Sequence, residues 1–277
     1  MTVAFVLSGG ASLGASHAGM LEALYERGIR PDLLVGSSVG AINAAFIASR
    51  PPTVGTARDL QQIWRGLTRS DVFPANPVTA GLGLLGWRDH SVSAGSLRQL
   101  VRRHLEIERL EDAAVDVHVV TVDVLTGEEV LLSRGAAVDA VLASAAIPGI
   151  FPAVPWESRL LMDGSVANDV PISHAIELGA DRVIVLHAIG TEPLSRAPQG
   201  VLAAGAAAMF RSLTRRFAED IVRYADVAEL VILPAPQVEA IMPTDFAHAH
   251  ELIAAARGRA RSRLARGGNV VQLRRAA

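Results

Sequence analysis

Residues 33–43 constrain the fold of this chain more than any other segment. An apolar run enters the pentapeptide 36–40, which has Ser38 at its centre and is followed by small, helix-forming residues. A buried strand that passes through a glycine-flanked turn into a helix is the local context of a nucleophile elbow. Gly36 and Gly40 lack a Cβ atom, so the strand and the helix can approach closely. The helix that follows would offer amide donors and the positive end of its dipole to an oxyanion.

The same five-residue pattern also arises by chance in an ordinary βα turn, so the elbow needs support from elsewhere in the chain. Residues 3–7 form a continuous apolar run, as expected of a core strand in a parallel sheet, and not of a signal peptide. Residues 182–186 and 229–233 have the same character, and residues 115–124 and 129–132 are typical of a hairpin. Helical segments separate these runs, which together predict an α/β fold.

A glycine-rich loop, with Gly9, Gly10 and Ala11, follows the first predicted strand. Ala11 occupies the position where a dinucleotide-binding G-x-G-x-x-G pattern requires its second glycine. A Walker lysine is excluded because the chain contains no lysine. We expect a nest of backbone N–H groups near the elbow, as an oxyanion hole requires, with a plain packing turn as the alternative.

Composition excludes several kinds of chemistry. The chain has 277 residues and no cysteine, so thiolate catalysis and Cys-ligated zinc are impossible. The formal net charge of −2 gives no reason to expect nucleic acid as a partner. No apolar stretch reaches the ~18 residues that a membrane span needs. The default expectation is a cytoplasmic protein.

One domain is expected to span residues 1–277, with a lid-like insertion at about 51–95 and a helical C-terminal extension at about 199–277. Within the insertion, residues 81–87 combine glycine with apolar side chains. They are interpreted as a lid or a contact for an acyl chain, or else as a loop that packs on the domain. The arginine-rich stretch after Arg257 is expected to be solvated and frayed.

A serine nucleophile needs a proton acceptor. Asp163 ends a short predicted strand and begins an Asp-Gly turn, which would bring its carboxylate to the sheet edge of Ser38. Asp123 is a rival by the same argument, and either aspartate could instead only satisfy its own turn. His174 and His187 are the candidates for a triad histidine, although neither stands in the loop context that such a residue usually has. The pattern of residues leaves this choice open.

The chain resembles the patatin-like phospholipases across residues 3–187 through several ordered motifs. These motifs are residues 8–19, 36–40, 143–152 and 163–171. The resemblance implies a three-layer α/β/α fold with a central, mostly parallel sheet. It further implies a catalytic dyad in which Ser38 attacks an acyl carbonyl and Asp163 accepts its proton. The amides of Gly9, Gly10 and Ala11 would form the oxyanion hole, and neither a cofactor nor a metal would be needed.

This sequence departs from the family pattern at three positions. Ala11 replaces a third glycine and would restrict the loop if its backbone requires a positive φ. Leu13 replaces an arginine or lysine, which removes a positive charge and would alter the preference for a lipid head group. Ser165 replaces glycine or alanine and is small enough to be accommodated.

The predicted function is hydrolysis of ester-linked fatty acyl chains in phospholipids, lysophospholipids or related lipids, through an acyl-enzyme on Ser38. The protein would meet a membrane or micelle surface transiently, as a peripheral protein. One alternative is an acyltransferase or thioesterase that uses the same serine. The other is a lipid-binding module in which Ser38 and Asp163 have lost their catalytic role.

Overall fold

The computed structural model describes residues 1–74, 90–190, 200–236, 242 and 244–266, and the segment 81–87 lies outside these residues. The strands are β1 (Val3–Leu7), β2 (Leu33–Ser37), β3 (Asp116–Asp123), β4 (Glu129–Leu132), β5 (Val154–Trp156), β6 (Arg159–Asp163), β7 (Arg182–Leu186) and β8 (Glu229–Leu233). The α-helices are α1 (Ala15–Tyr25), α2 (Val39–Ala48), α3 (Val54–Gly66), α4 (Arg69–Val72), α6 (Gly95–His104), α7 (Ala137–Ser144), α8 (Ile172–Glu177), α9 (Val201–Tyr224) and α10 (Ala249–Ala265). Short 3₁₀ turns include η1 (Ala11–Gly14), η2 (Leu110–Asp112) and η3 (Gly164–Val166).

The strands form one sheet in the order β5-β6-β3-β2-β1-β7-β8, and β4 pairs with β3 off this path. The strands β3, β2, β1, β7 and β8 are parallel, whereas β4, β5 and β6 are antiparallel to their neighbours. The mostly parallel sheet and the predicted hairpin of β3 and β4 are therefore confirmed. The three-residue strand β5 was not predicted, because it is too short to show a periodic pattern.

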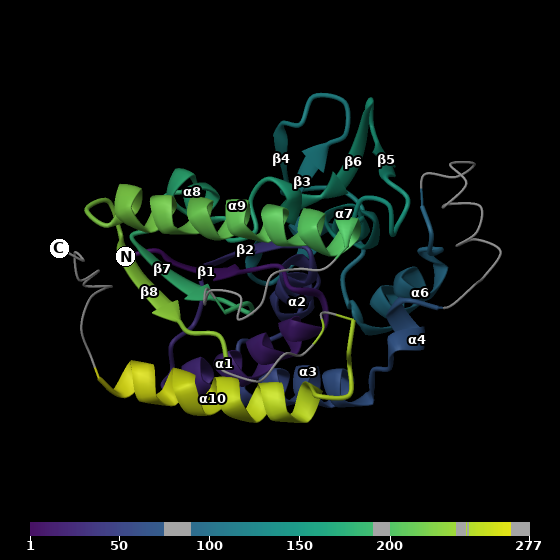
Figure 1. The fold of residues 1–277 in the computed structure, drawn as a ribbon. Helices are drawn as coiled ribbons and strands as arrows, with labels where there is room; N and C mark the ends of the chain where they lie inside the picture. Colours follow the sequence, from purple (N-terminus) through teal and green to yellow (C-terminus); the bar gives the residue numbers. More distant parts are fainter. Residues whose placement is uncertain (75–89, 191–199, 237–241, 243, 267–277) are drawn as a thin grey trace.

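Helices cover both faces of the sheet, with α8 and α9 on one face and α1, α2, α3 and α10 on the other (Figure 1). Strand β1 shows how the sequence produces these layers, because successive strand residues point to opposite faces. Phe5 and Leu7 belong to the core that includes residues of α1, α2 and α10. Ala4 and Val6 belong to the core under α8 and α9. The expected α/β/α architecture is thus confirmed.

Strands β2 and β6 meet end to end along one edge of β3. Ser37, the last residue of β2, is paired with Val120, and Asp163, the last residue of β6, is paired with Thr121. Strand β4 pairs with residues 119–122 of β3, so it occupies the opposite edge. Because β2 runs parallel and β6 antiparallel to β3, their carboxyl ends point toward each other. Asp163 therefore reaches the elbow along an antiparallel strand.

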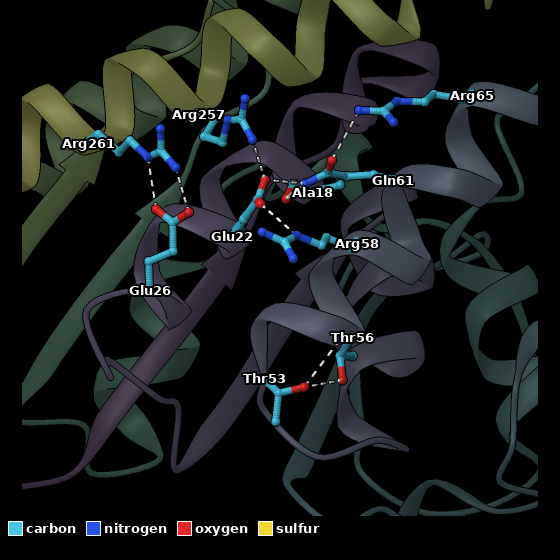
Figure 2. Close-up of polar contacts among 10 residues, drawn as sticks. All are labelled: Ala18, Glu22, Glu26, Thr53, Thr56, Arg58, Gln61, Arg65, Arg257 and Arg261. Carbon is cyan, nitrogen blue, oxygen red and sulfur yellow. Dashed lines mark hydrogen bonds and ion pairs between the residues drawn. The ribbon is translucent and has the colours of Figure 1, made fainter.

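The arginine-rich C-terminal helix is docked on the fold as far as it is described. Helix α10 packs against α1, and a Cβ atom added at Gly19 would lie 2.2 Å from the Ile253 carbonyl oxygen. Figure 2 shows Arg257 directed at Glu22 and Arg261 directed at Glu26, with N–O distances of 3.0 and 2.5 Å. The expectation that the stretch after Arg257 is frayed was wrong for residues 258–265, because they continue α10 and Arg261 pairs with Glu26 at the end of α1.

Among the described residues, no helix combines the length and the apolar character that crossing a bilayer requires.

Candidate active site

Ser38 occupies a strained turn between β2 and α2. Its backbone has φ 53° and ψ −125°, a region that residues with a Cβ rarely adopt. The glycines on either side are needed for packing. A Cβ at Gly36 would lie 2.5 Å from the Gly40 carbonyl oxygen, and a Cβ at Gly40 would lie 2.1 Å from the Leu7 carbonyl oxygen. The close fit between β1, β2 and α2 holds Ser38 in this conformation.

The Ser38 hydroxyl donates a hydrogen bond to Asp163 Oδ2 at 2.7 Å. Both side chains are buried, and Asp163 Oδ1 accepts a second hydrogen bond, from the Ser165 N–H, at 2.8 Å. Gly164 allows this approach because a Cβ there would lie 2.2 Å from the Val120 carbonyl oxygen. The structure thus brings together the serine and one of the two aspartates that the sequence singled out.

Burial raises the pKa of Asp163 to about 7, and the nearby carboxylate of Asp169 acts in the same direction. Hydrogen bonds from Ser38 and Ser165 oppose this rise without cancelling it. Burial also raises the pKa of Asp169 to about 6. A carboxyl group with a pKa near neutrality, in contact with a hydroxyl, is suited to take a proton and return it.

The other candidates for the proton acceptor are engaged elsewhere. Asp123 Oδ1 accepts hydrogen bonds from the backbone N–H groups of Leu125 and Thr126, so this aspartate serves its own turn. His174 bonds to Glu129 at 2.8 Å; burial lowers its pKa, but this carboxylate raises the pKa overall. Burial lowers the pKa of His187 to about 4, and its ring lies 4.7 Å from that of Phe217.

The glycine-rich loop lies near the elbow, because Ala11 and Ser38 line the same cavity. Gly10 and Ala11 have φ values of 139° and 49°, so Ala11 does adopt the left-handed conformation that its side chain disfavours. Within the described residues, no hydrogen-bond acceptor contacts their N–H groups. The Gly9 N–H differs from expectation, since it donates to the Asp169 carbonyl oxygen at 3.2 Å.

Sequence reasoning missed two polar residues that hold the elbow. Ser144 accepts a hydrogen bond from the Ser38 N–H at 2.9 Å and donates to the Val120 carbonyl at 2.6 Å. Asn43 donates to the Gly14 carbonyl at 3.0 Å and accepts from the Trp64 indole at 3.1 Å, which ties α2 to the glycine-rich loop and to α3. Two features of the sequence could have identified them: Asn43 lies in the elbow helix, and Ser144 lies in the motif at residues 143–152.

An apolar cavity of about 90 Å³ opens beside Ser38. Ala11 and Ser38 belong to its lining, and the rest comes largely from apolar residues of α2, α3, α4 and α6. These residues include Ile42, Phe46, Leu60, Ile63, Trp64, Val72, Leu97, Leu100 and Val101, with Phe73, Phe151 and Phe246 from loops. Helices of the 51–95 segment therefore form one side of the cavity, whereas the interpretation of residues 81–87 is not tested.

Two relatives illustrate the similarity to known sequences. Patatin-like phospholipase domain-containing protein 6 of Mus musculus is 28% identical over 187 residues, which cover 67% of this chain and 13% of that protein. An uncharacterised NTE family protein of Mycobacterium tuberculosis is 28% identical over 218 residues, or 78% of this chain and 57% of that protein. The chain thus spans only part of these relatives.

Among solved structures, VipD from Legionella pneumophila matches 96% of this chain and 66% of its own length, with a TM-score of 0.54 and 15% identity. At this level of identity the match shows a shared fold. The family model described as patatin-like phospholipase matches residues 5–176, which is more than half of the sequence. The chain therefore belongs to the patatin-like phospholipase family.

Proposed function

We propose that this protein hydrolyses ester-linked fatty acyl chains of phospholipids or lysophospholipids, with Ser38 and Asp163 as a catalytic dyad. The main support is the 2.7 Å hydrogen bond from the Ser38 hydroxyl to Asp163 within a strained, buried elbow. The apolar cavity that begins at Ser38 supports an acyl chain as the part of the substrate that is bound there.

In the acylation step, the ionised Asp163 carboxylate takes the proton of the Ser38 hydroxyl as the oxygen attacks the ester carbonyl. The carbonyl oxygen becomes an oxyanion, which the N–H groups of Gly10 and Ala11 stabilise. One such donor is worth about 3 kcal/mol of the barrier in another serine hydrolase. Protonated Asp163 then returns its proton to the leaving alkoxide, and the acyl group stays on Ser38.

In the deacylation step, Asp163 takes a proton from a water molecule, which attacks the acyl-enzyme carbonyl. The tetrahedral intermediate collapses, the proton returns to Ser38, and a fatty acid leaves. The Gly9 N–H, which donates to the Asp169 carbonyl, positions the loop in this proposal and does not contact the oxyanion.

A membrane or micelle surface is the proposed source of the substrate, reached by transient peripheral contact. The apolar residue Leu13 follows the oxyanion loop where the family has a positive charge. We therefore expect little preference for anionic over zwitterionic head groups, which a comparison of vesicles of each type would measure.

Labelling with a fluorophosphonate probe tests the dyad without knowledge of the true lipid, because the probe reacts with activated serines. The wild type should be labelled, Ser38→Ala should not, and Asp163→Asn should react far more slowly. Asp123→Asn is the matched control and should be labelled like the wild type, since Asp123 only closes a turn.

An unlabelled, folded wild type would contradict the proposal and favour a lipid-binding module. If labelling succeeds, turnover in the presence of added alcohol or thiol acceptors would separate a hydrolase from an acyltransferase.

A further inference from the structure

A second cavity lies next to the one that begins at Ser38. Its volume is about 220 Å³. Residues of α6, the end of α7, the loop 151–153 and β5 line it, among them Leu97, Arg98, Leu142, Ala145, Phe151 and Ala153. All are apolar except Arg98, whose guanidinium is paired with Asp139 at 2.5 Å. The second cavity therefore suits an apolar ligand.

The two cavities share three residues, Leu97, Ala145 and Phe151, which form a wall between them. Leu97 and Phe151 are each 4% exposed, and both belong to the hydrophobic core. The Phe151 ring stacks on that of Phe73, with the ring centroids 5.4 Å apart.

Backbone hydrogen bonds hold the loop that carries Phe151. The Val92 N–H donates to the Ile150 carbonyl at 2.8 Å, and the Ser91 N–H donates to the Gly149 carbonyl at 3.1 Å. Protein interiors are close-packed and yield little to an added methylene group, so a wall fixed in this way is expected to stop a chain.

We propose that the wall of Leu97, Ala145 and Phe151 limits the length of the acyl chain, and that the second cavity is a latent subsite for the distal methylenes of longer chains. This inference rests on the proposed function, since it assigns the substrate's acyl chain to the cavity at Ser38. Chains of medium length end against the wall, and longer chains bind poorly until the wall is opened.

The test compares two leucines that line the first cavity from different helices, Leu97 on α6 and Leu60 on α3. Leu97→Ala opens the wall, whereas Leu60→Ala removes the same atoms from a residue on α3 that is 3% exposed and does not line the second cavity. The kcat/KM of p-nitrophenyl esters from butanoyl to hexadecanoyl should peak at medium length in the wild type. Leu97→Ala should raise the hexadecanoyl to octanoyl ratio by about tenfold or more, the lower end of what one methylene contributes in an apolar pocket.

Leu60→Ala should change this ratio less than about twofold, because it adds volume without a passage. Adding Ala153→Leu to Leu97→Ala fills the second cavity and should return the ratio toward the wild-type value. The smaller truncation Leu97→Val should shift the ratio in the same direction, and it covers the case in which Leu97→Ala does not fold. Equal shifts in Leu97→Ala and Leu60→Ala, or no shift in folded Leu97 variants, would overturn the proposal.

Different experiments test the proposed wall and the proposed catalytic dyad. Binding of octanoate and hexadecanoate to Ser38→Ala, with and without Leu97→Ala, reports the length limit without turnover. If fluorophosphonate does not label the wild type but Leu97→Ala still raises the affinity for hexadecanoate, the proposed reaction is contradicted and the proposed length limit is supported.

Discussion

Two buried carboxylates in this protein have opposite environments. Glu22 on α1 is 1% exposed and contacts Arg58 and Arg257 at 3.0 Å each and the Gln61 amide at 2.8 Å (Figure 2). Asp163 is 3% exposed and has a hydroxyl and a backbone N–H as hydrogen-bond donors. Burial acts to raise the pKa of Glu22, but its three partners lower that pKa overall, whereas burial raises the pKa of Asp163 to about 7.

The difference shows that the partners of a buried acid, more than burial itself, decide what the acid does. Glu22 stays ionised and joins α1, α3 and α10, which are regular helices. Asp163, whose pKa is raised to about 7, bonds to Ser38, a residue with a strained backbone. Glu22 therefore contributes to the stability of the helical region, whereas Asp163 belongs to the proposed catalytic site at the junction of β2 and β6.

The largest effect is expected for Asp163→Asn, because an amide cannot accept the Ser38 proton. The kcat/KM for a short ester should fall about 10⁴-fold, as with other members of serine catalytic units. Thermal unfolding should be unchanged or slightly improved, since a buried carboxyl is removed. Activity within tenfold of the wild type, measured on protein freed of contaminating esterases, would contradict the role of Asp163.

Glu22→Gln should lower stability but leave the activity per folded molecule nearly unchanged, the opposite of Asp163→Asn. Removing the charge leaves two arginines without their carboxylate, which we expect to cost about 2–3 kcal/mol in the free energy of unfolding. Fully buried pairs lose more, but the Arg58 and Arg257 side chains are 62% and 38% exposed and can be rehydrated. Denaturant unfolding measures the loss.

Glu26→Gln is the matched control for this change, because Glu26 is the C-cap of α1, one turn after Glu22, and pairs with Arg261 in a more exposed position. Its loss of stability should be clearly smaller. Equal losses for the two variants would mean that the burial of Glu22 does not increase the contribution of its ion pairs to the free energy of unfolding.

The pH dependence of activity should reflect the raised pKa of Asp163. Only the ionised carboxylate accepts a proton, so kcat/KM should rise with pH through an apparent pKa of about 7. Asp169→Asn removes a neighbouring negative charge, which makes ionisation of Asp163 easier and should move this acidic limb to lower pH. An unchanged profile in Asp169→Asn would show that the two carboxyl groups are not coupled.

The smallest effect is expected for Ala11→Gly. Left-handed backbone costs a residue with a Cβ about 1–2 kcal/mol, and the greater freedom of glycine in the unfolded chain offsets part of the gain. The free energy of unfolding should therefore rise by roughly 0.5–1 kcal/mol. The rate of fluorophosphonate labelling should stay within about twofold, because the backbone N–H groups are unchanged. A large increase in rate would mean that Ala11 distorts the oxyanion loop.

Local signals in the sequence determined most of the secondary structure. The apolar runs at residues 3–7, 182–186 and 229–233 are strands with these same bounds, because a strand buried on both faces needs no other pattern. The strand-turn-helix context at Ser38 likewise predicted the turn, whose glycines are required by contacts within a few residues and with β1.

Only the tertiary structure decided how these pieces meet. Strand β6 runs antiparallel and points at the end of β2, so that Asp163, 125 residues away in sequence, bonds to Ser38. The docking of Arg257 on Glu22, the Gly9 N–H bonded to Asp169 and the shared wall of the two cavities also depend on segments that are distant in the chain. A sequence pattern records the preferences of neighbouring residues, whereas such pairings are selected by the packing of the whole sheet and its helices, which no local window contains.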